Sequence, residues 1–93
     1  MELVKLPNIG KKLSNDLVYV GITTVDEFHK VGSREAWRLI LEKDPSAWTL
    51  RLFALEGAIQ GVSLQSIDEE TKSSLKEYVA LLKPSKKAAK NIH

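Results

Sequence analysis

Cysteine is absent from the 93-residue chain, and this absence removes several classes of protein. Disulfide-stapled secreted domains, thiolate enzymes and cysteine-ligated zinc or iron–sulfur centres all need a residue type that the chain lacks. Aromatic residues are also scarce at 6%, whereas leucine, alanine, lysine and glutamate are plentiful. Because these four residue types are strong helix formers, the composition predicts a helical domain.

Long hydrophobic runs are missing too. The longest stretch without a charged residue, residues 57–67, has 11 residues, whereas a membrane-spanning helix needs about 20 apolar residues. The first five residues lack the apolar region of a signal peptide. We therefore expect a cytoplasmic protein with no membrane contact, and the chain length fits one domain.

An excess of basic charge is confined to the end of the chain, although the formal net charge is +2. Residues 83–93 hold four lysines and no acidic residue, so residues 1–82 carry 10 basic and 12 acidic groups, a net charge of −2. We predict a folded domain over residues 1–82 and a basic, mobile tail over residues 83–93. The folded part is not basic, so any binding of nucleic acid must be local.

Helix start and stop signals predict an all-α fold, a compact bundle of about five helices. Thr24 and Ser66 each begin a capping-box pattern. Ser33 and Asp44 are further N-cap candidates, and the proline after Asp44 suits the first position of a helix. The predicted helices cover residues 10–20, 24–31, 33–43, 45–62 and 67–82.

The fourth predicted helix is apolar over most of its circumference, which is typical of a buried central helix. One stripe holds the larger residues Trp48, Leu52, Leu55, Ile59 and Val62, and a neighbouring stripe holds the small residues Ala54, Gly57, Ala58 and Gly61. A glycine inside a helix costs up to about 1 kcal/mol relative to alanine, and the close approach of another backbone commonly compensates it. That backbone belongs either to the chain's own core or to a partner chain, so the small-residue stripe is also a candidate interface.

No pattern in the sequence carries catalysis. The two histidines, His29 and His93, lie far apart without a metal-ligand pattern near either. Residues 68–70 are acidic, but the start of a helix explains them. Gly10 and Lys11 superficially resemble a P-loop, yet lysine follows where serine or threonine is required. We expect a binding protein and not an enzyme, with no catalytic residue, metal or cofactor.

Residues 6–13, with the sequence LPNIGKKL, are the most informative segment. Their pattern resembles a helix-hairpin-helix loop, a tight turn of glycine-type residues around one apolar residue. Asn8 stands where that motif prefers its first glycine, and asparagine suits the position because it tolerates left-handed backbone angles. Ile9 is expected to enter the core, and Gly10 to permit close approach to the free amides of the next helix, an anion site. Residues 30–34 have a similar shape, but acidic neighbours make them a poorer phosphate site.

Two lysines in this segment break a local rule. Lys11 and Lys12 lie at the positive end of the predicted helix dipole, where cations are unfavourable by a few tenths of a kcal/mol. A bound nucleic-acid phosphate would reverse the sign of this effect. The predicted phosphate site consists of Lys5, Asn8, Gly10, Lys11 and Lys12. The alternative is that both lysines are merely solvated, with Lys12 able to reach Asp16 one turn later.

Three stretches of the sequence resemble a known family. They are residues 6–10 (LPNIG), residues 20–24 (VGITT) followed by Phe28 and residues 31–37 (VGSREAW), and residues 52–61 (LFALEGAIQG). Over roughly residues 3–82 the chain resembles the C-terminal domain of TfoX/Sxy, bacterial regulators of natural competence. The resemblance implies a helical, hairpin-containing fold and a role connected with transcriptional regulation, without established catalytic residues. Family proteins commonly carry an additional N-terminal domain. We expect this chain to be a free-standing relative without that domain.

Two functions remain open from the sequence. The first is a regulatory module that holds the DNA phosphate backbone weakly, because lysines and amides position a protein on DNA without reading its sequence. The second is a protein–protein interaction module that binds a second copy of itself or a regulatory protein. The small-residue stripe and the two tryptophans motivate the second function, since tryptophan is favoured at interface hot spots.

Overall fold

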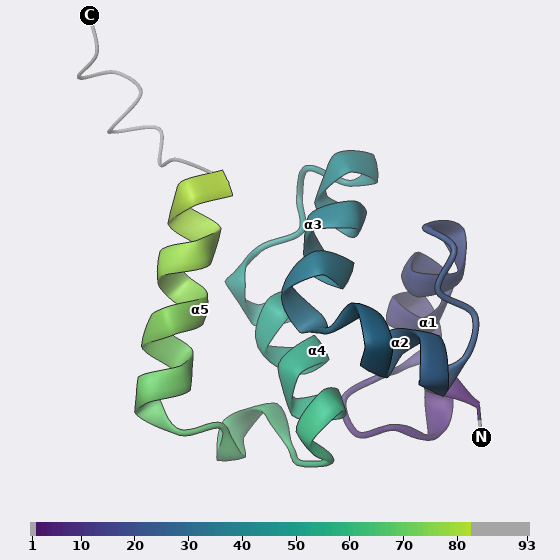
Figure 1. Ribbon diagram of the computed structural model, residues 1–93, viewed down its shortest axis with the longest axis horizontal. Coiled ribbons are helices and arrows are strands. Elements are labelled where there is room, and N and C mark those ends of the chain that lie inside the picture. Colours follow the sequence, from purple (N-terminus) through teal and green to yellow (C-terminus); the bar gives the residue numbers. More distant parts are fainter. Residues whose placement is uncertain (1, 83–93) are drawn as a thin grey trace, which may run out of the picture.

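The computed structural model describes residues 2–82, and over that range it contains five α-helices and no strand. The helices are α1 (Lys11–Tyr19), α2 (Val25–Val31), α3 (Ser33–Lys43), α4 (Thr49–Gln60) and α5 (Glu69–Leu82), with 3₁₀ turns η1 (Leu3–Lys5) and η2 (Leu64–Ser66). Helix α4 lies in the middle of the bundle, with α5 along one side and α1 and α2 toward the other (Figure 1). The predicted all-α bundle of about five helices is confirmed.

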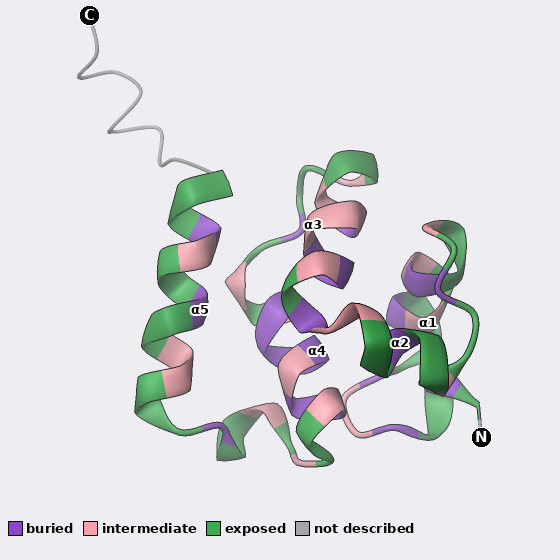
Figure 2. Ribbon diagram, in the orientation of Figure 1, coloured by how far each residue is buried: buried purple, intermediate pink, exposed green. Residues whose placement is uncertain are grey.

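The core is built around α4, as its apolar circumference predicts. Buried residues gather on α4 and on the faces of the neighbouring helices that turn toward it (Figure 2). Trp37 of α3 is fully buried, and its indole Nε1–H donates to the Trp48 carbonyl oxygen at 3.3 Å. The same ring packs edge-on against Tyr78 of α5, with ring centroids 6.0 Å apart. Trp37 therefore joins α3 to the start of α4 and to α5.

The start of α2 follows the sequence pattern closely. The Thr24 hydroxyl accepts a hydrogen bond from the Glu27 amide at 3.1 Å, and the Glu27 carboxylate accepts one from the Thr24 amide at 3.1 Å. Further hydrogen bonds from the Thr23 amide and hydroxyl are the main reason that the pKa of Glu27 is lowered. The predicted capping box at Thr24 is confirmed.

Two predicted caps, at Ser33 and Ser66, are wrong. Gly32, and not Ser33, is the N-cap of α3, and the Ser33 hydroxyl instead donates to the Glu56 carboxylate of α4 at 2.5 Å. Ser66 lies in η2, and the Asp68 carboxylate accepts the hydrogen bond from the Thr71 amide at the start of α5, at 2.8 Å. Asp68 therefore fills the capping position, which asparagine, aspartate and serine all suit.

The fourth helix begins later than predicted. Asp44 and Pro45 form a turn instead of a helix start: the Ala47 amide donates to the Asp44 carbonyl oxygen at 3.0 Å, and proline occupies the second turn position. Helix α4 starts only at Thr49, with Trp48 as its N-cap residue. Trp48 was predicted on the buried stripe, but 49% of it is exposed because it precedes the helix.

Two further expectations concern the ends of the fold. The predicted basic tail, residues 83–93, lies outside the described residues, so the division of the chain at residue 82 stays a prediction. Leu82, the last residue of α5, is 40% exposed. Within residues 2–82, no helix is both long and apolar enough to cross a bilayer.

Candidate functional site

The N-terminal loop, residues 6–12, begins with a tight turn. The Ile9 amide donates to the Leu6 carbonyl oxygen at 3.3 Å. Asn8 has a φ of +67°, and a proline before a left-handed residue is the arrangement of a type II turn. Ile9 is only 4% exposed and belongs to the core. The left-handed backbone predicted for Asn8 and the burial predicted for Ile9 are both confirmed.

The loop leads into α1, whose first amides have no partner within residues 2–82. Gly10 is the N-cap and supplies no side chain, and the first hydrogen bond of the helix runs from the Ser14 amide to the Gly10 carbonyl oxygen at 2.9 Å. The amides of Lys11, Lys12 and Leu13 therefore stay available to a ligand. A Cβ atom added to Gly10 would meet no atom within 4 Å, so an incoming group has room to approach.

The lysines predicted to hold phosphate are exposed at the start of α1 and on η1. Lys11 and Lys12 lie at the start of α1, and Lys5 lies on η1, which packs against α1. None of the three pairs with an acidic group in the described part of the chain. The pairing of Lys12 with Asp16 is not formed, because Asp16 lies 3.5 Å from the Arg51 guanidinium instead.

Arg51 of α4 bridges two acidic residues beside the loop. Its guanidinium lies 3.5 Å from the Asp16 carboxylate of α1 and 2.9 Å from the Asp44 carboxylate at the end of α3. A hydrogen bond from the Ser46 hydroxyl, together with Arg51, holds the pKa of Asp44 well below its usual range. Since Arg51 already neutralises the Asp16 charge, the positive charges of Lys11 and Lys12 remain available to attract an anion.

The Asn8 side chain points into the molecule and holds the loop in place. Its Nδ2 donates to the Val62 carbonyl oxygen at 2.9 Å and to the Ala54 carbonyl oxygen at 3.3 Å. Its Oδ1 accepts from the Leu64 amide at 3.1 Å. These partners lie on α4 and on the turn that follows it. Asn8 was predicted as a member of the phosphate site, and its amide group is occupied by the chain's own backbone.

Gly57 explains how the Asn8 amide fits against α4. A Cβ atom at Gly57 would lie 2.5 Å from Asn8 Nδ2 and 2.7 Å from the Val62 carbonyl oxygen. The close approach expected at this glycine is thus made inside the chain. Ala54 and Ala58 of the same stripe are buried as well, whereas Gly61 is exposed and ends α4 with a left-handed φ of +79°.

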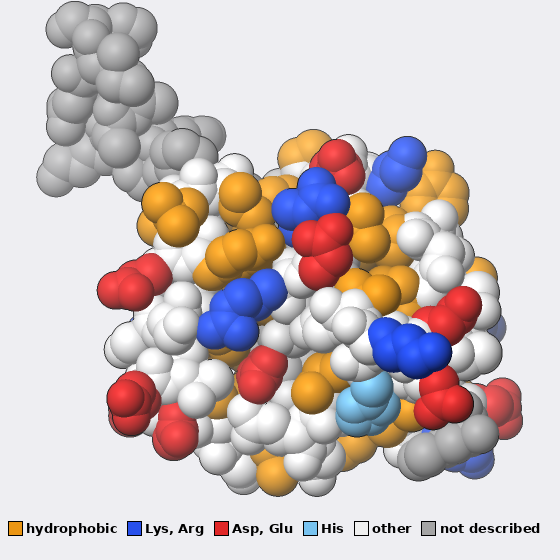
Figure 3. All heavy atoms as spheres, in the orientation of Figure 1, with side chains coloured by type: hydrophobic (Ala, Val, Ile, Leu, Met, Phe, Trp, Pro, Cys, Tyr) orange, Lys and Arg blue, Asp and Glu red, His pale blue; other side chains and the backbone are white. Residues whose placement is uncertain are grey.

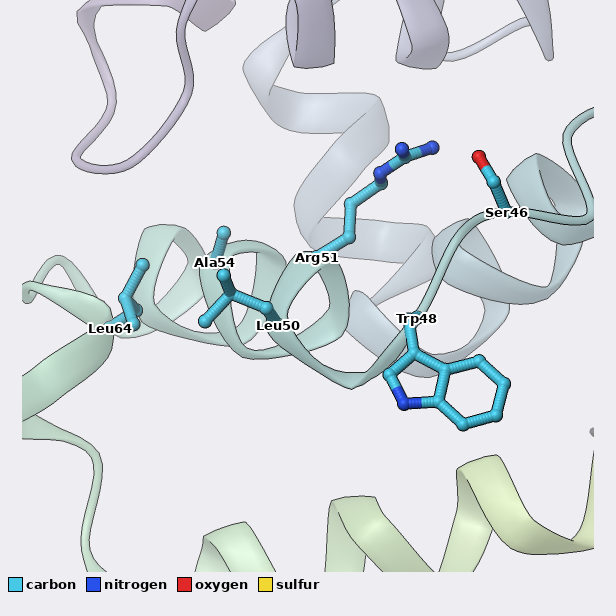
Figure 4. Close-up of a pocket in the computed structure, with 6 residues that line it drawn as sticks. All are labelled: Ser46, Trp48, Leu50, Arg51, Ala54 and Leu64. Atoms are coloured by element: carbon cyan, nitrogen blue, oxygen red, sulfur yellow. The ribbon is translucent and has the colours of Figure 1, made fainter. Parts of the chain in front are cut away.

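A shallow pocket of about 370 Å³ lies next to the loop anchor, and sequence reasoning missed it. Its lining residues are Ser46, Trp48, Leu50, Arg51, Ala54 and Leu64 (Figure 4). The Trp48 indole points away from the Arg51 guanidinium, toward α5 (Figure 4). Leu50 is 65% exposed. The exposure of Trp48 at this pocket follows from the start of α4 at Thr49. The sequence predicted a start at residue 45, four residues earlier, and therefore placed Trp48 on the buried stripe.

Charged side chains of both signs are spread over the remaining surface of residues 2–82. Lys and Arg side chains alternate with Asp and Glu on the face seen in Figure 3. Arg38 and Glu35 of α3 form an ion pair at 2.6 Å. Within residues 2–82, no three His, Asp or Glu side chains lie together as a group that holds a metal ion.

These features define a class, a small all-α domain in which the loop before the first helix is hydrogen-bonded through Asn8 to α4 and the turn that follows it. The chain belongs to the TfoX C-terminal domain family, whose model matches residues 1–79. It is thus a member of the family that the sequence stretches at residues 6–10, 20–37 and 52–61 resemble.

Two solved structures share this fold closely. A crystal structure of an uncharacterized protein from Listeria monocytogenes, triclinic form, is 44% identical with a TM-score of 0.88, covering 90% of this chain and 96% of that one. A crystal structure of a protein of unknown function from Listeria monocytogenes, tetragonal form, is 46% identical with a TM-score of 0.84, covering 87% of this chain and 99% of that one. No curated protein compared with the chain matches it.

Proposed function

We propose that the chain is a non-enzymatic, cytoplasmic regulatory module that holds the phosphate backbone of DNA at its N-terminal loop. One observation carries the proposal: the amides of Lys11, Lys12 and Leu13 have no acceptor in the described chain, and two exposed lysines flank them. Helix N-termini bind anions through such amides, and the lysines add the charge that phosphate requires. A phosphate bound there also compensates the unfavourable electrostatic free energy of two lysines at the positive end of the helix.

The same geometry limits the kind of binding. Amides and lysines contact phosphate without reading bases, so binding is weak and independent of sequence. No described helix presents a row of arginine, asparagine or glutamine side chains that would read base edges. Membership of the TfoX C-terminal domain family supports a role in the regulation of transcription and competence.

Removing the two helix lysines tests this function. We expect Lys11→Ala with Lys12→Ala to weaken binding of a labelled DNA duplex, measured by fluorescence anisotropy. The slope of log affinity against log salt should fall by about 2, one unit for each lost phosphate contact. Gly10→Ala should also weaken binding while the fold remains stable, since its Cβ atom meets nothing in the chain but would obstruct a phosphate.

Two matched controls accompany this experiment. Lys30→Ala with Lys76→Ala removes the same charge from exposed positions on α2 and α5 and should leave the salt slope almost unchanged. Replacing the four lysines of residues 83–93 by alanine shows how much affinity comes from the tail. If binding disappears with the tail lysines, or if both lysine pairs act equally, the loop is not the phosphate site.

A second function, a protein–protein interaction module, is favoured by the exposed pocket residues. Trp48 is 49% and Leu50 is 65% exposed, and both line the pocket beside α4. This function predicts a sedimentation coefficient that rises with protein concentration, and Leu50→Glu should abolish the rise by placing a charge in the apolar contact. A chain that stays monomeric at high concentration contradicts a homodimer.

A further inference from the structure

Hydrogen bonds tie the N-terminal loop to the distant part of the fold through a single side chain, while Leu6 and Ile9 are buried in the core. The loop backbone bonds only to nearby residues before α1 begins: the Leu6 amide donates to the Leu3 carbonyl oxygen at 3.0 Å, and the Ile9 amide to the Leu6 carbonyl oxygen at 3.3 Å. The hydrogen bonds that join the loop to the second half of the described chain all come from the Asn8 amide group, at 2.9, 3.1 and 3.3 Å. They span 46 to 56 positions of sequence, so they fix the loop against a distant part of the fold.

Asparagine meets two requirements at this position together. The backbone needs a φ of +67°, which glycine adopts freely and asparagine tolerates better than most residues. The anchor needs one acceptor and two donors directed at the Leu64 amide and at the Ala54 and Val62 carbonyl oxygens. Glycine supplies only the first requirement. An asparagine here thus gives the loop a fixed position as well as its turn.

Gly57 is the counterpart that makes room for this anchor. Its hydrogen takes the place where any larger residue would put a Cβ atom 2.5 Å from Asn8 Nδ2. The same Cβ would lie 2.7 Å from the Val62 carbonyl oxygen, one of the two acceptors of the Asn8 amide. Both contacts are too short for a carbon atom, so a side chain at residue 57 displaces the anchor and the turn after α4.

We propose that Asn8 is the positioning residue of the phosphate-binding loop, with Gly57 as its required counterpart. The inference rests on the proposed function, since it names the residue that holds that site in its binding geometry. By fixing the loop, Asn8 presents the free amides of residues 11–13 to a phosphate in one arrangement before binding. A ligand that meets a preorganised site does not have to order it, and its affinity is higher for that reason.

The variant Asn8→Gly tests this role, because it keeps the left-handed turn and removes the anchor. We expect the chain to stay folded by circular dichroism, while the ¹⁵N order parameters of residues 9–12 fall from about 0.85 toward 0.6. If the loop then occupies its binding geometry about a tenth of the time, the dissociation constant for a DNA duplex rises about tenfold. The salt slope should stay unchanged because Lys11 and Lys12 are still present.

A second variant and a control make the result decisive. Gly57→Ala displaces the Asn8 side chain without changing any residue of the loop, so it should lower the same order parameters. Gln65→Ala removes an exposed amide from η2 and should change neither loop order nor affinity. Unchanged order parameters in Asn8→Gly overturn the positioning role, and so does a loosened loop with unchanged affinity. A wild-type chain that does not bind the duplex refutes the proposed function, and the order parameters still decide whether Asn8 fixes the loop.

Discussion

Replacing Gly57 by alanine is expected to destabilise the chain by about 2 kcal/mol, although the same change in an ordinary helix stabilises it by about 1 kcal/mol. The added methyl group would lie 2.5 Å from Asn8 Nδ2 and 2.7 Å from the Val62 carbonyl oxygen. Overpacking of this kind costs about 1–3 kcal/mol, and each hydrogen bond that Asn8 then loses contributes about 1 kcal/mol more. The sign of the effect therefore distinguishes this glycine from an unconstrained one.

Thermal or urea unfolding measures this change. The melting temperature should fall by roughly 8–16 °C, given about 4–8 °C per kcal/mol for a domain of this size. Gly10→Ala is the matched control, because Gly10 has a φ of −89° and a Cβ atom there meets nothing within 4 Å. Combining Gly57→Ala with Asn8→Gly should cost less than the sum of the two changes, since the clash with Nδ2 disappears. A stabilised Gly57→Ala chain would show that the anchor is not packed as described.

Replacing Trp37 by alanine is expected to have the largest effect on stability, a loss of about 3–5 kcal/mol. The indole is fully buried, donates to the Trp48 carbonyl oxygen at 3.3 Å and packs edge-on against Tyr78. Its removal leaves a cavity where α3, α4 and α5 meet. A domain of this size has a total stability of only about 4–12 kcal/mol, so the variant is expected to lose between a quarter and all of it.

The second tryptophan provides the comparison. Trp48 is 49% exposed, and Trp48→Ala should cost about 1 kcal/mol or less. Urea unfolding followed by circular dichroism measures both variants without relying on tryptophan emission. Equal losses for the two variants would mean that Trp37 is not the residue that joins the three helices.

Local signals in the sequence predicted those elements whose partners lie close along the chain. The capping box at Thr24 involves residues only three positions apart, and the left-handed backbone of Asn8 follows from the turn pattern around it. The apolar circumference of the helix predicted over residues 45–62 likewise indicated that α4 (Thr49–Gln60) lies at the centre of the bundle.

The predictions failed where a distant partner decides. Ser33 looks like a cap, but its hydroxyl is used by Glu56, 23 positions later. Proline after Asp44 suits the first turn of a helix and the second position of a β-turn equally well, and the structure has the turn. The anchor between Asn8 and residues 54–64 was not predicted for the same reason, because no local pattern links segments so far apart.

The phosphate site itself was only partly predictable. The sequence placed Lys11 and Lys12 at a helix start and Gly10 before them, and the structure has all three exposed there. The sequence did not reveal that Asp16 forms an ion pair with Arg51. That ion pair leaves Lys12 without an acidic partner among residues 2–82. The contribution of each lysine depends on that ion pair, formed between α1 and α4.

The most direct test of the central claim is a titration of the ¹⁵N-labelled chain with a short DNA duplex at low salt, followed by two-dimensional NMR. The account predicts that the largest shifts occur at the amides of Gly10, Lys11, Lys12 and Leu13, and that added salt reverses them. Shifts confined to residues 83–93, or centred on the pocket around Trp48 and Leu50, would contradict it. The first result would assign DNA binding to the tail alone, and the second would move the binding surface to the pocket.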